Sequence, residues 1–140
     1  MTRLAAAALT LGLVACATDT ARLTPELEQR FATEGIVRRA DNVVFRYTHD
    51  AGTRSAGWED RVASIIVTTR TVYIHKNQKV GLEITPEARR AFDVARSGER
   101  VRIGAGSGKS REIWSFVPSE DAPGWTTDIR NVTGARAEPR

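Results

Sequence analysis

The sequence predicts a mostly β domain with flanking helices. Residues 42–49 alternate apolar and polar side chains, so that Val43, Phe45 and Tyr47 share one face of an extended chain, with Arg46 and Thr48 on the other. Short segments rich in branched residues follow at even spacing, separated by polar or glycine-containing turns. A helix-start pattern stands at each end of this β-rich stretch. Together these observations favour an antiparallel meander between two helices.

A short helix is expected first, within residues 24–35. Thr24 can cap the free backbone amides, and the proline after it fits the first helical position. Leu27 and Phe31 are four residues apart and share a face, and Gly35 can end the helix in a left-handed conformation. A helix this short is marginal alone, so we expect residues 25–34 to lie against the domain.

Seven strands are expected after this helix. Two turns are clear: Lys76-Asn77-Gln78-Lys79 is polar, and the glycine-rich residues 106–110 join the last two strands. The predicted strands are 42–49, 61–69, 71–75, 80–84, 89–96, 100–105 and 111–117.

Residues 85–98 fit two structures. Thr85-Pro86-Glu87 has the form of a helix start, and the alanines that follow have helical spacing. Phe92 and Val94 also alternate, however, and Ser97-Gly98 suits a hairpin turn. We favour a strand over 89–96 and keep the helix as the alternative.

The second helix follows Pro118, which ends the sheet. Asp121 can cap it, and Trp125, Ile129 and Val132 lie at i, i+4 and i+7 on one face. Trp125 is expected in the core and Trp114 on a partly covered face. Residues 134–140 are predicted to be a disordered tail.

The N-terminus has the form of a secretory signal. A basic start, Met1-Thr2-Arg3, precedes an apolar run over residues 4–15 that is too short to span a bilayer. The run ends in Leu13-Val14-Ala15-Cys16, which contains the only cysteine of the chain. These four residues resemble the lipobox of bacterial lipoproteins.

The lipoprotein resemblance implies a cell-envelope protein. It implies removal of the signal peptide, residues 1–15, lipidation of Cys16 with fatty acids such as palmitate, and a tether over residues 16–23. Two or more acyl chains give stable anchoring to a membrane. Ala17 stands where an aspartate would signal retention at the inner membrane. The implied location is therefore extracytoplasmic, on the periplasmic face of the outer membrane.

Residues 42–133 resemble bacterial pleckstrin-homology-like (PH-like) domains. The resemblance rests on Val67-Thr68-Thr69-Arg70-Thr71-Val72-Tyr73-Ile74, similar to the family's second-to-third hairpin, and on Trp125 with Ile129, similar to its closing helix. It implies a seven-stranded antiparallel split barrel closed by a C-terminal helix. The family's Lys…Lys/Arg-x-Arg pattern for phosphoinositide headgroups is absent, so that activity is not carried over.

Charge and motifs argue against several partners and cofactors. The chain has 21 basic and 17 acidic residues, and Arg3 would leave with the signal, so the mature excess of +3 is too mild to predict a nucleic-acid partner. Gly104 to Ser110 is not a phosphate-binding loop, because Ile103 stands where a glycine is required, so no nucleotide is expected. With His49 and His75 as the only histidines, we expect no metal and no cofactor.

No catalytic residues are predicted, and the protein is not expected to be an enzyme. His49-Asp50 with Ser55 is the only candidate trio, but neighbours on a strand point to opposite faces. His75 is expected to be a half-exposed sheet residue.

The candidate binding surface comprises Trp58, Arg89, Arg100 and Arg102. Arginines can serve an anionic lipid or an acidic partner, and an aromatic residue in a loop suits recognition. The alternative is a solvated outer face that discourages edge pairing. The leading hypothesis is a membrane-anchored binding or scaffolding module for an envelope protein or anionic lipid. The other hypotheses are a cell-envelope enzyme accessory and a purely structural lipoprotein.

Overall fold

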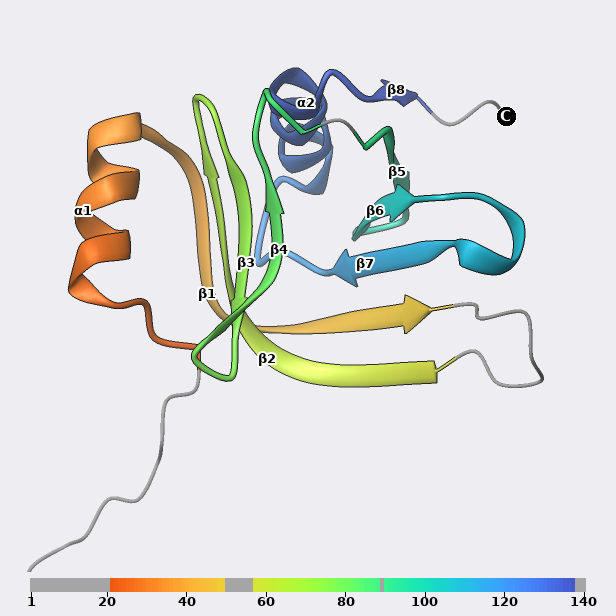
Figure 1. Ribbon diagram of the computed structural model, residues 1–140, viewed down its shortest axis with the longest axis horizontal. Coiled ribbons are helices and arrows are strands. Elements are labelled where there is room, and N and C mark those ends of the chain that lie inside the picture. The colour runs from red at the N-terminus through yellow and green to blue at the C-terminus, as the bar shows by residue number, and fades with distance from the viewer. Residues whose placement is uncertain (1–20, 50–56, 89, 138–140) are drawn as a thin grey trace, which may run out of the picture.

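The computed structural model describes residues 21–49, 57–88 and 90–137 of the chain. Within them, eight strands form one sheet in the order β4-β3-β2-β1-β7-β6-β5-β8, antiparallel except between β5 and β8 (Figure 1). The helices are α1 (Pro25–Glu34) and α2 (Ala122–Thr133), with a 3₁₀ turn at Gly108–Ser110. The strands are β1 (Ile36–His49), β2 (Gly57–Thr68), β3 (Val72–Lys76), β4 (Lys79–Ile84), β5 (Phe92–Ser97), β6 (Arg100–Ala105), β7 (Glu112–Phe116) and β8 (Arg136–Ala137).

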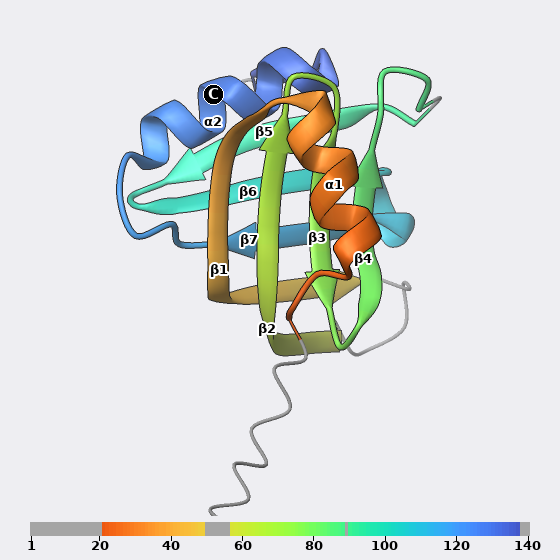
Figure 2. The same cartoon turned by 90° about the vertical axis from the view of Figure 1, so that its left-hand side faces the viewer.

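The sheet folds into two layers because β1 bends. β1 pairs with β2 along its whole length but with β7 only over Phe45–His49. The register with β2 shifts between Ala40 and Val43, where Asn42 has a left-handed φ of 55°. Such a bulge kinks a strand and increases its twist. The first half of β1 therefore lies in a layer with β2, β3 and β4, and its second half in a layer with β7, β6 and β5 (Figure 2).

The core lies between these layers, and α2 closes it. The Trp125 ring meets the Phe116 ring edge-on at 5.3 Å, and Ile129 is fully buried beside it. The strands bury their inward residues there, among them Phe45, Ile65, Val67, Ile74, Val101 and Ile103. The predicted fold class is confirmed: a split barrel of seven antiparallel strands, closed by a C-terminal helix.

Charged side chains hold α2 in place. Asp121 caps the helix by accepting a hydrogen bond from the Gly124 amide at 3.1 Å. Arg38 of β1 forms ion pairs with Asp121 at 2.8 Å and Asp128 at 2.7 Å. Arg130 donates two hydrogen bonds, of 3.0 and 2.8 Å, to the carbonyl oxygen of Val94. The helix is thus tied to both layers.

Helix α1 has the bounds that the sequence predicts, and it packs on the outer face of β2, β3 and β4 (Figure 2). Thr24 accepts a hydrogen bond from the Leu27 amide, and Gly35 ends the helix with a φ of 82°. Phe31 is fully buried, with its ring 5.0 Å from that of Tyr73. This contact supplies the packing that a ten-residue helix requires.

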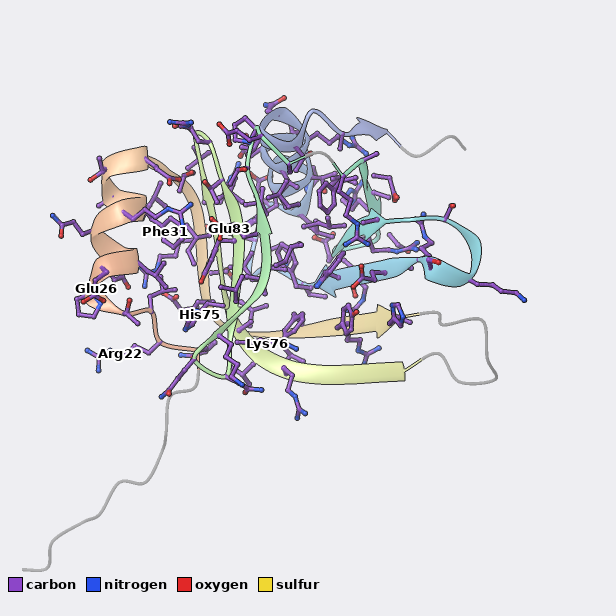
Figure 3. The ribbon with its side chains drawn as sticks, in the orientation of Figure 1. Arg22, Glu26, Phe31, His75, Lys76 and Glu83 are labelled. Atoms are coloured by element: carbon purple, nitrogen blue, oxygen red, sulfur yellow. The ribbon has the colours of Figure 1, made fainter. Side chains whose placement is uncertain are left out.

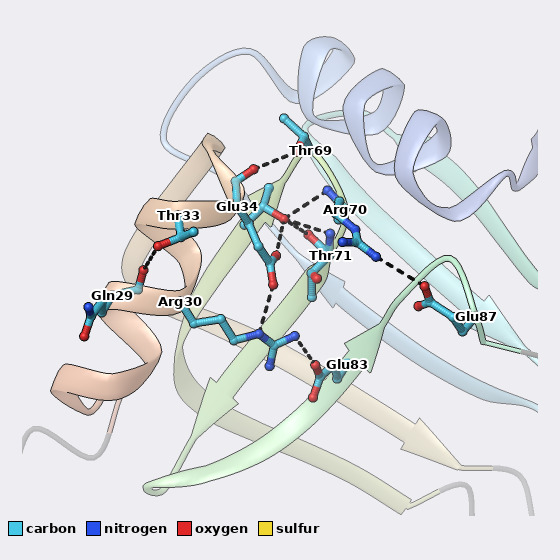
Figure 4. A network of polar contacts seen from close by, with 10 residues as sticks. Gln29, Arg30, Thr33, Glu34, Thr69, Arg70, Thr71, Glu83 and Glu87 are labelled. Carbon is cyan, nitrogen blue, oxygen red and sulfur yellow. Dashed lines mark hydrogen bonds and ion pairs between the residues drawn. The ribbon is translucent and has the colours of Figure 1, made fainter.

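The end of α1 is fixed by hydrogen bonds to the β2–β3 turn (Figure 4). The Thr68 hydroxyl donates to the Glu34 carboxylate at 2.7 Å, and the Thr69 hydroxyl donates to the Glu34 carbonyl oxygen at 2.6 Å. Arg30 bridges Glu34 and Glu83 of β4. Burial alone would raise the pKa of Glu34, but the hydrogen bonds from Thr68 and its neighbours outweigh burial and lower it. Glu34 therefore stays ionised where α1 meets the sheet.

Several strands differ from the sequence prediction, and β2, for example, begins at Gly57 rather than at residue 61. β1 begins at Ile36 rather than at residue 42, because Ile36 to Ala40 pair with the end of β2. The ambiguous region forms the strand Phe92–Ser97, so the helical alternative is wrong. Arg136 and Ala137, predicted to be disordered, pair in parallel with β5. For β1 and β8, a partner strand distant in sequence supplies the hydrogen bonds, whereas β5 pairs along its whole length with its hairpin neighbour β6.

Candidate binding surface

The outer face of β1, β2 and β6, with the residue that follows β7, carries valines beside arginines, and we call it the open face. We define it by Val44, Val62, Val117, Arg46, Arg100 and Arg102. Val44 and Val62 are direct partners in the β1–β2 ladder. Since Phe45 pairs with Phe116, Val117 lies beside Val44 on the other side. Val44 is 57% exposed, and Val62 and Val117 are each 42% exposed.

Arginines border these valines. Arg102 and Arg46 both pair in register with Ser115 of β7, from opposite sides. Arg100 lines a cavity of about 390 Å³ together with Arg46, Val44, Val117 and Asp41. In the part of the chain that the structure describes, neither Arg100 nor Arg102 forms an ion pair. The open face therefore combines apolar area with two arginines, Arg100 and Arg102, that have no ion-pair partner among the described residues.

Two of the four predicted surface residues lie on this face, Arg100 and Arg102. Trp58 pairs in backbone register with Thr48, but its side chain lies outside the described residues. Arg89 and the lipidation candidate Cys16 also lie outside them. The three valines were missed as site residues. Val44 was the available signal, because it is apolar at a position whose neighbours on the same face, Arg46 and Thr48, are polar.

The prediction for His75 is wrong. His75 is 2% exposed rather than half-exposed, and its ring stacks on the Tyr73 ring with the two centroids 6.0 Å apart. Ala21 and Leu23, predicted to belong to the tether, are themselves buried, and Arg22 between them lies beside the histidine. Burial lowers the pKa of His75, opposed by a hydrogen bond with the Arg22 backbone. His75 is thus a covered sheet residue beneath the segment that precedes α1.

The two histidines do not form a common site. His49 is exposed, and it lies opposite Glu112 on the inward-facing side of β1, whereas His75 belongs to the outward side of β3. Asp50 and Ser55, the other members of the candidate trio, lie outside the described residues. Among the residues with described positions, no group of three or more His, Cys, Asp or Glu side chains is placed to hold a metal ion.

A second polar cluster joins β1, β7 and the segment before β5. The Tyr47 hydroxyl donates to Glu112 at 2.7 Å, and Arg90 pairs with the same carboxylate. The Arg90 guanidinium also lies 5.8 Å from the centre of the Trp114 ring. Trp114, expected on a partly covered face, is buried. Burial would raise the pKa of Glu112, but the hydrogen bonds from Tyr47 and Arg90 outweigh it and lower the pKa. The polar groups of this cluster bind one another, so the cluster stabilises the fold.

The glycine-rich loop agrees with its interpretation as a hairpin tip. It leaves β6, makes the 3₁₀ turn Gly108–Ser110 and enters β7, which pairs with β6. A phosphate-binding loop would instead lead from a strand into a helix whose N-terminus faces the phosphates.

Comparisons with known proteins add no identity: no family model matches this chain, and no curated protein matches it. Neither α1 nor α2, the helices of the described residues, has the length and apolar character needed to cross a bilayer.

Proposed function

We propose that this protein is a membrane-anchored lipoprotein whose PH-like domain acts as a binding or scaffolding module of the cell envelope. Its anchor is an acylated Cys16, and its location is the periplasmic face of the outer membrane. The sequence Leu13-Val14-Ala15-Cys16 after an apolar run supports the anchor.

The open face is the observation that supports a binding role. A single exposed valine needs no explanation, because much of any protein surface is apolar. Here three exposed valines from three neighbouring chain segments adjoin one another, and they are bordered by two arginines that have no ion-pair partner within the part of the chain that the structure describes. Contiguous apolar area with a charged rim is typical of interaction sites.

Metabolic labelling tests the anchor. Cells producing the wild-type protein and the Cys16→Ser variant are grown with labelled palmitate. We expect label and membrane association for the wild type, and neither for the variant, because the thiol is the acylated group. Unlabelled wild-type protein that fractionates like the variant contradicts the lipoprotein assignment.

Affinity capture from the cell's own membranes tests the binding role. The bait is the lipidated protein, compared with the double variant Arg100→Ala/Arg102→Ala. Lys109→Ala is the matched control, since Lys109 is an exposed cation in the β6–β7 loop. We expect envelope components that both the wild type and the control retain to be lost from the double variant. Equal recovery by all three removes the arginines from the site.

A further inference from the structure

The domain begins close to the proposed anchor. Ala21 and Leu23 are buried on the outer face of the sheet, so docked chain replaces the end of the predicted tether. Only four residues separate Cys16 from Ala21. A fully extended chain spans at most about 3.6 Å per residue, which puts Ala21 within about 18 Å of the acylated residue. If Cys16 is lipidated, as proposed above, the part of the domain around Ala21 lies at the membrane.

Ala21 lies at the end of the sheet that holds the β3–β4 turn. Arg22 and Leu23 line a cavity of about 620 Å³ together with Gln78 of that turn. Figures 1 and 2 both show the start of the described chain beside this turn, at the end of the sheet where β1 also bends. In Figure 3, Arg22 lies below α1 at the end of the sheet that holds His75 and Lys76.

The open face adjoins this same end. Ala63 pairs with Lys76, so Val62 is next to the β3–β4 turn. Val62 pairs with Val44, Val44 adjoins Val117, and Val117 shares a cavity with Arg100. We call this line, from the turn through Val62, Val44 and Val117 to Arg100, the base row. It starts where the chain leaves for the proposed anchor.

Most of the charged side chains that the structure describes beside the base row are positive. Arg22 and Lys79 are exposed at one end of it, and Arg100 and Arg102 lie at the other. Two acids near it, Glu28 beside Arg22 and Asp41 in the Arg100 cavity, both bind Arg39. Valines flanked by cations match a layer of phosphates above acyl chains, where apolar burial and electrostatic attraction add together.

We propose that the base row rests on the anionic lipid headgroups of the membrane that holds Cys16. The domain then works in one orientation, with Val62, Val44 and Val117 toward the lipid and α2 at the opposite end (Figure 1). This inference rests on the proposed lipid anchor and names the ligand of the open face.

Site-specific fluorescence quenching tests the orientation. The natural chain has one cysteine, so acylation at Cys16 would leave an introduced cysteine as the only free thiol. A fluorophore is attached to Val44→Cys, or to Asn131→Cys on the exposed side of α2 as the matched control. The lipidated full chain is placed in vesicles of phosphatidylethanolamine and phosphatidylglycerol that contain a quencher at headgroup depth.

We expect strong quenching for Val44→Cys and little for Asn131→Cys, with the difference shrinking in vesicles of phosphatidylcholine alone. Adding Arg100→Ala and Arg102→Ala should lower the docking equilibrium constant by about fivefold for each charge removed. Higher salt should act in the same direction, because it screens exposed charges.

The outcomes separate this proposal from the anchor. Protein that stays on the vesicles with equal quenching at both sites overturns the orientation and leaves the lipid anchor standing. Protein that does not stay on the vesicles overturns both. Solubilised membrane protein is then added as a competitor. If it abolishes the quenching of Val44→Cys, a protein is the preferred occupant of the open face, and the lipid assignment is overturned.

Discussion

The outer surface of the sheet has two parts that differ in what covers them: the covered part lies beneath α1 and the segment around Leu23, and the open face does not. β2 shows the contrast within a single strand, since Ile66 is fully buried and Val62, four residues earlier on the same side, is 42% exposed. α1 and the segment around Leu23 lie over Ile66, whereas no described element covers Val62. Both positions carry branched apolar side chains. Burial on this surface is thus decided by the chain segment above it, and the strand sequence alone does not reveal it.

The cations of the two parts differ in the same way. On the covered part, Arg30 binds Glu34 and Glu83, and Arg39 binds Glu28 and Asp41. Hydrogen bonding to Glu28 in particular raises the pKa of Arg39 above its usual value. On the open face, Arg100 and Arg102 have no ion-pair partner among the described residues. Arginines of the covered part are therefore held by acids of the fold, whereas Arg100 and Arg102 are not held in this way within the described residues.

The largest expected change in stability comes from a substitution in the covered part. Phe31→Ala should lower the free energy of unfolding by about 3–5 kcal/mol, because it leaves a cavity between α1 and Tyr73. Val44→Ala on the open face should change it by no more than about 0.5 kcal/mol. Urea unfolding of both variants measures the difference. Similar losses for the two would show that the open face is buried in the folded protein.

A buried hydroxyl gives the next effect. The Thr68 hydroxyl oxygen accepts hydrogen bonds from the amides of Arg70 at 3.1 Å and Thr71 at 2.8 Å. The same hydroxyl donates a hydrogen bond to the Glu34 carboxylate. Thr68→Val keeps the shape but removes these bonds, so we expect a loss of about 1–3 kcal/mol in urea unfolding. Thr48→Val, in the open part of β1, is the control and should change stability little. A stable Thr68→Val protein would mean that α1 does not depend on this contact.

Acid should loosen the covered part before the rest. The pKa of His75 is lowered in the folded state by burial, so the unfolded chain binds the proton more readily. Its contribution is complete above about pH 6.5 and is lost as the pH falls through that value toward the folded pKa. The carboxylates with lowered pKa, such as Glu34 and Glu112, lose theirs only below the ordinary value of 4.5.

Urea unfolding at pH 7.5 and 5.5 isolates this histidine effect. We expect a lower midpoint at the acid pH for the wild type and for the control His49→Gln, since His49 is exposed. His75→Phe should show a smaller difference between the two pH values. If the midpoints of His75→Phe at the two pH values differ as much as those of the wild type, another group causes the acid sensitivity.

The smallest expected effect concerns the open face. Arg100→Ala/Arg102→Ala should leave the free energy of unfolding within about 0.5 kcal/mol of the wild type, because these half-buried arginines have no ion-pair partner among the described residues. Arg39→Ala, which breaks an ion-pair network on the covered part, should cost up to about 1 kcal/mol. Thermal unfolding compares the two variants. A larger loss for the open-face variant would make its arginines structural.

Local signals in the sequence account for the parts of the fold that were predicted well. The bounds of α1 follow from Thr24, Pro25 and Gly35, and those of β6 from the turn residues at each end. Two of the six residues that define the open face were also predicted, because Arg100 and Arg102 share a face by strand alternation. The valines that complete it come from three different segments, and only strand pairing brings them together.

The sequence by itself determined the class of fold, the capped helices and the turns, since these depend on residues within a few positions of one another. Only the tertiary structure decided that Ala21 and Leu23 cover His75, that β1 starts at Ile36, and that Arg136 and Ala137 pair with β5. Each of these depends on a partner far away along the chain. A segment with weak preferences of its own takes the conformation in which distant neighbours bury its side chains and satisfy its backbone hydrogen bonds.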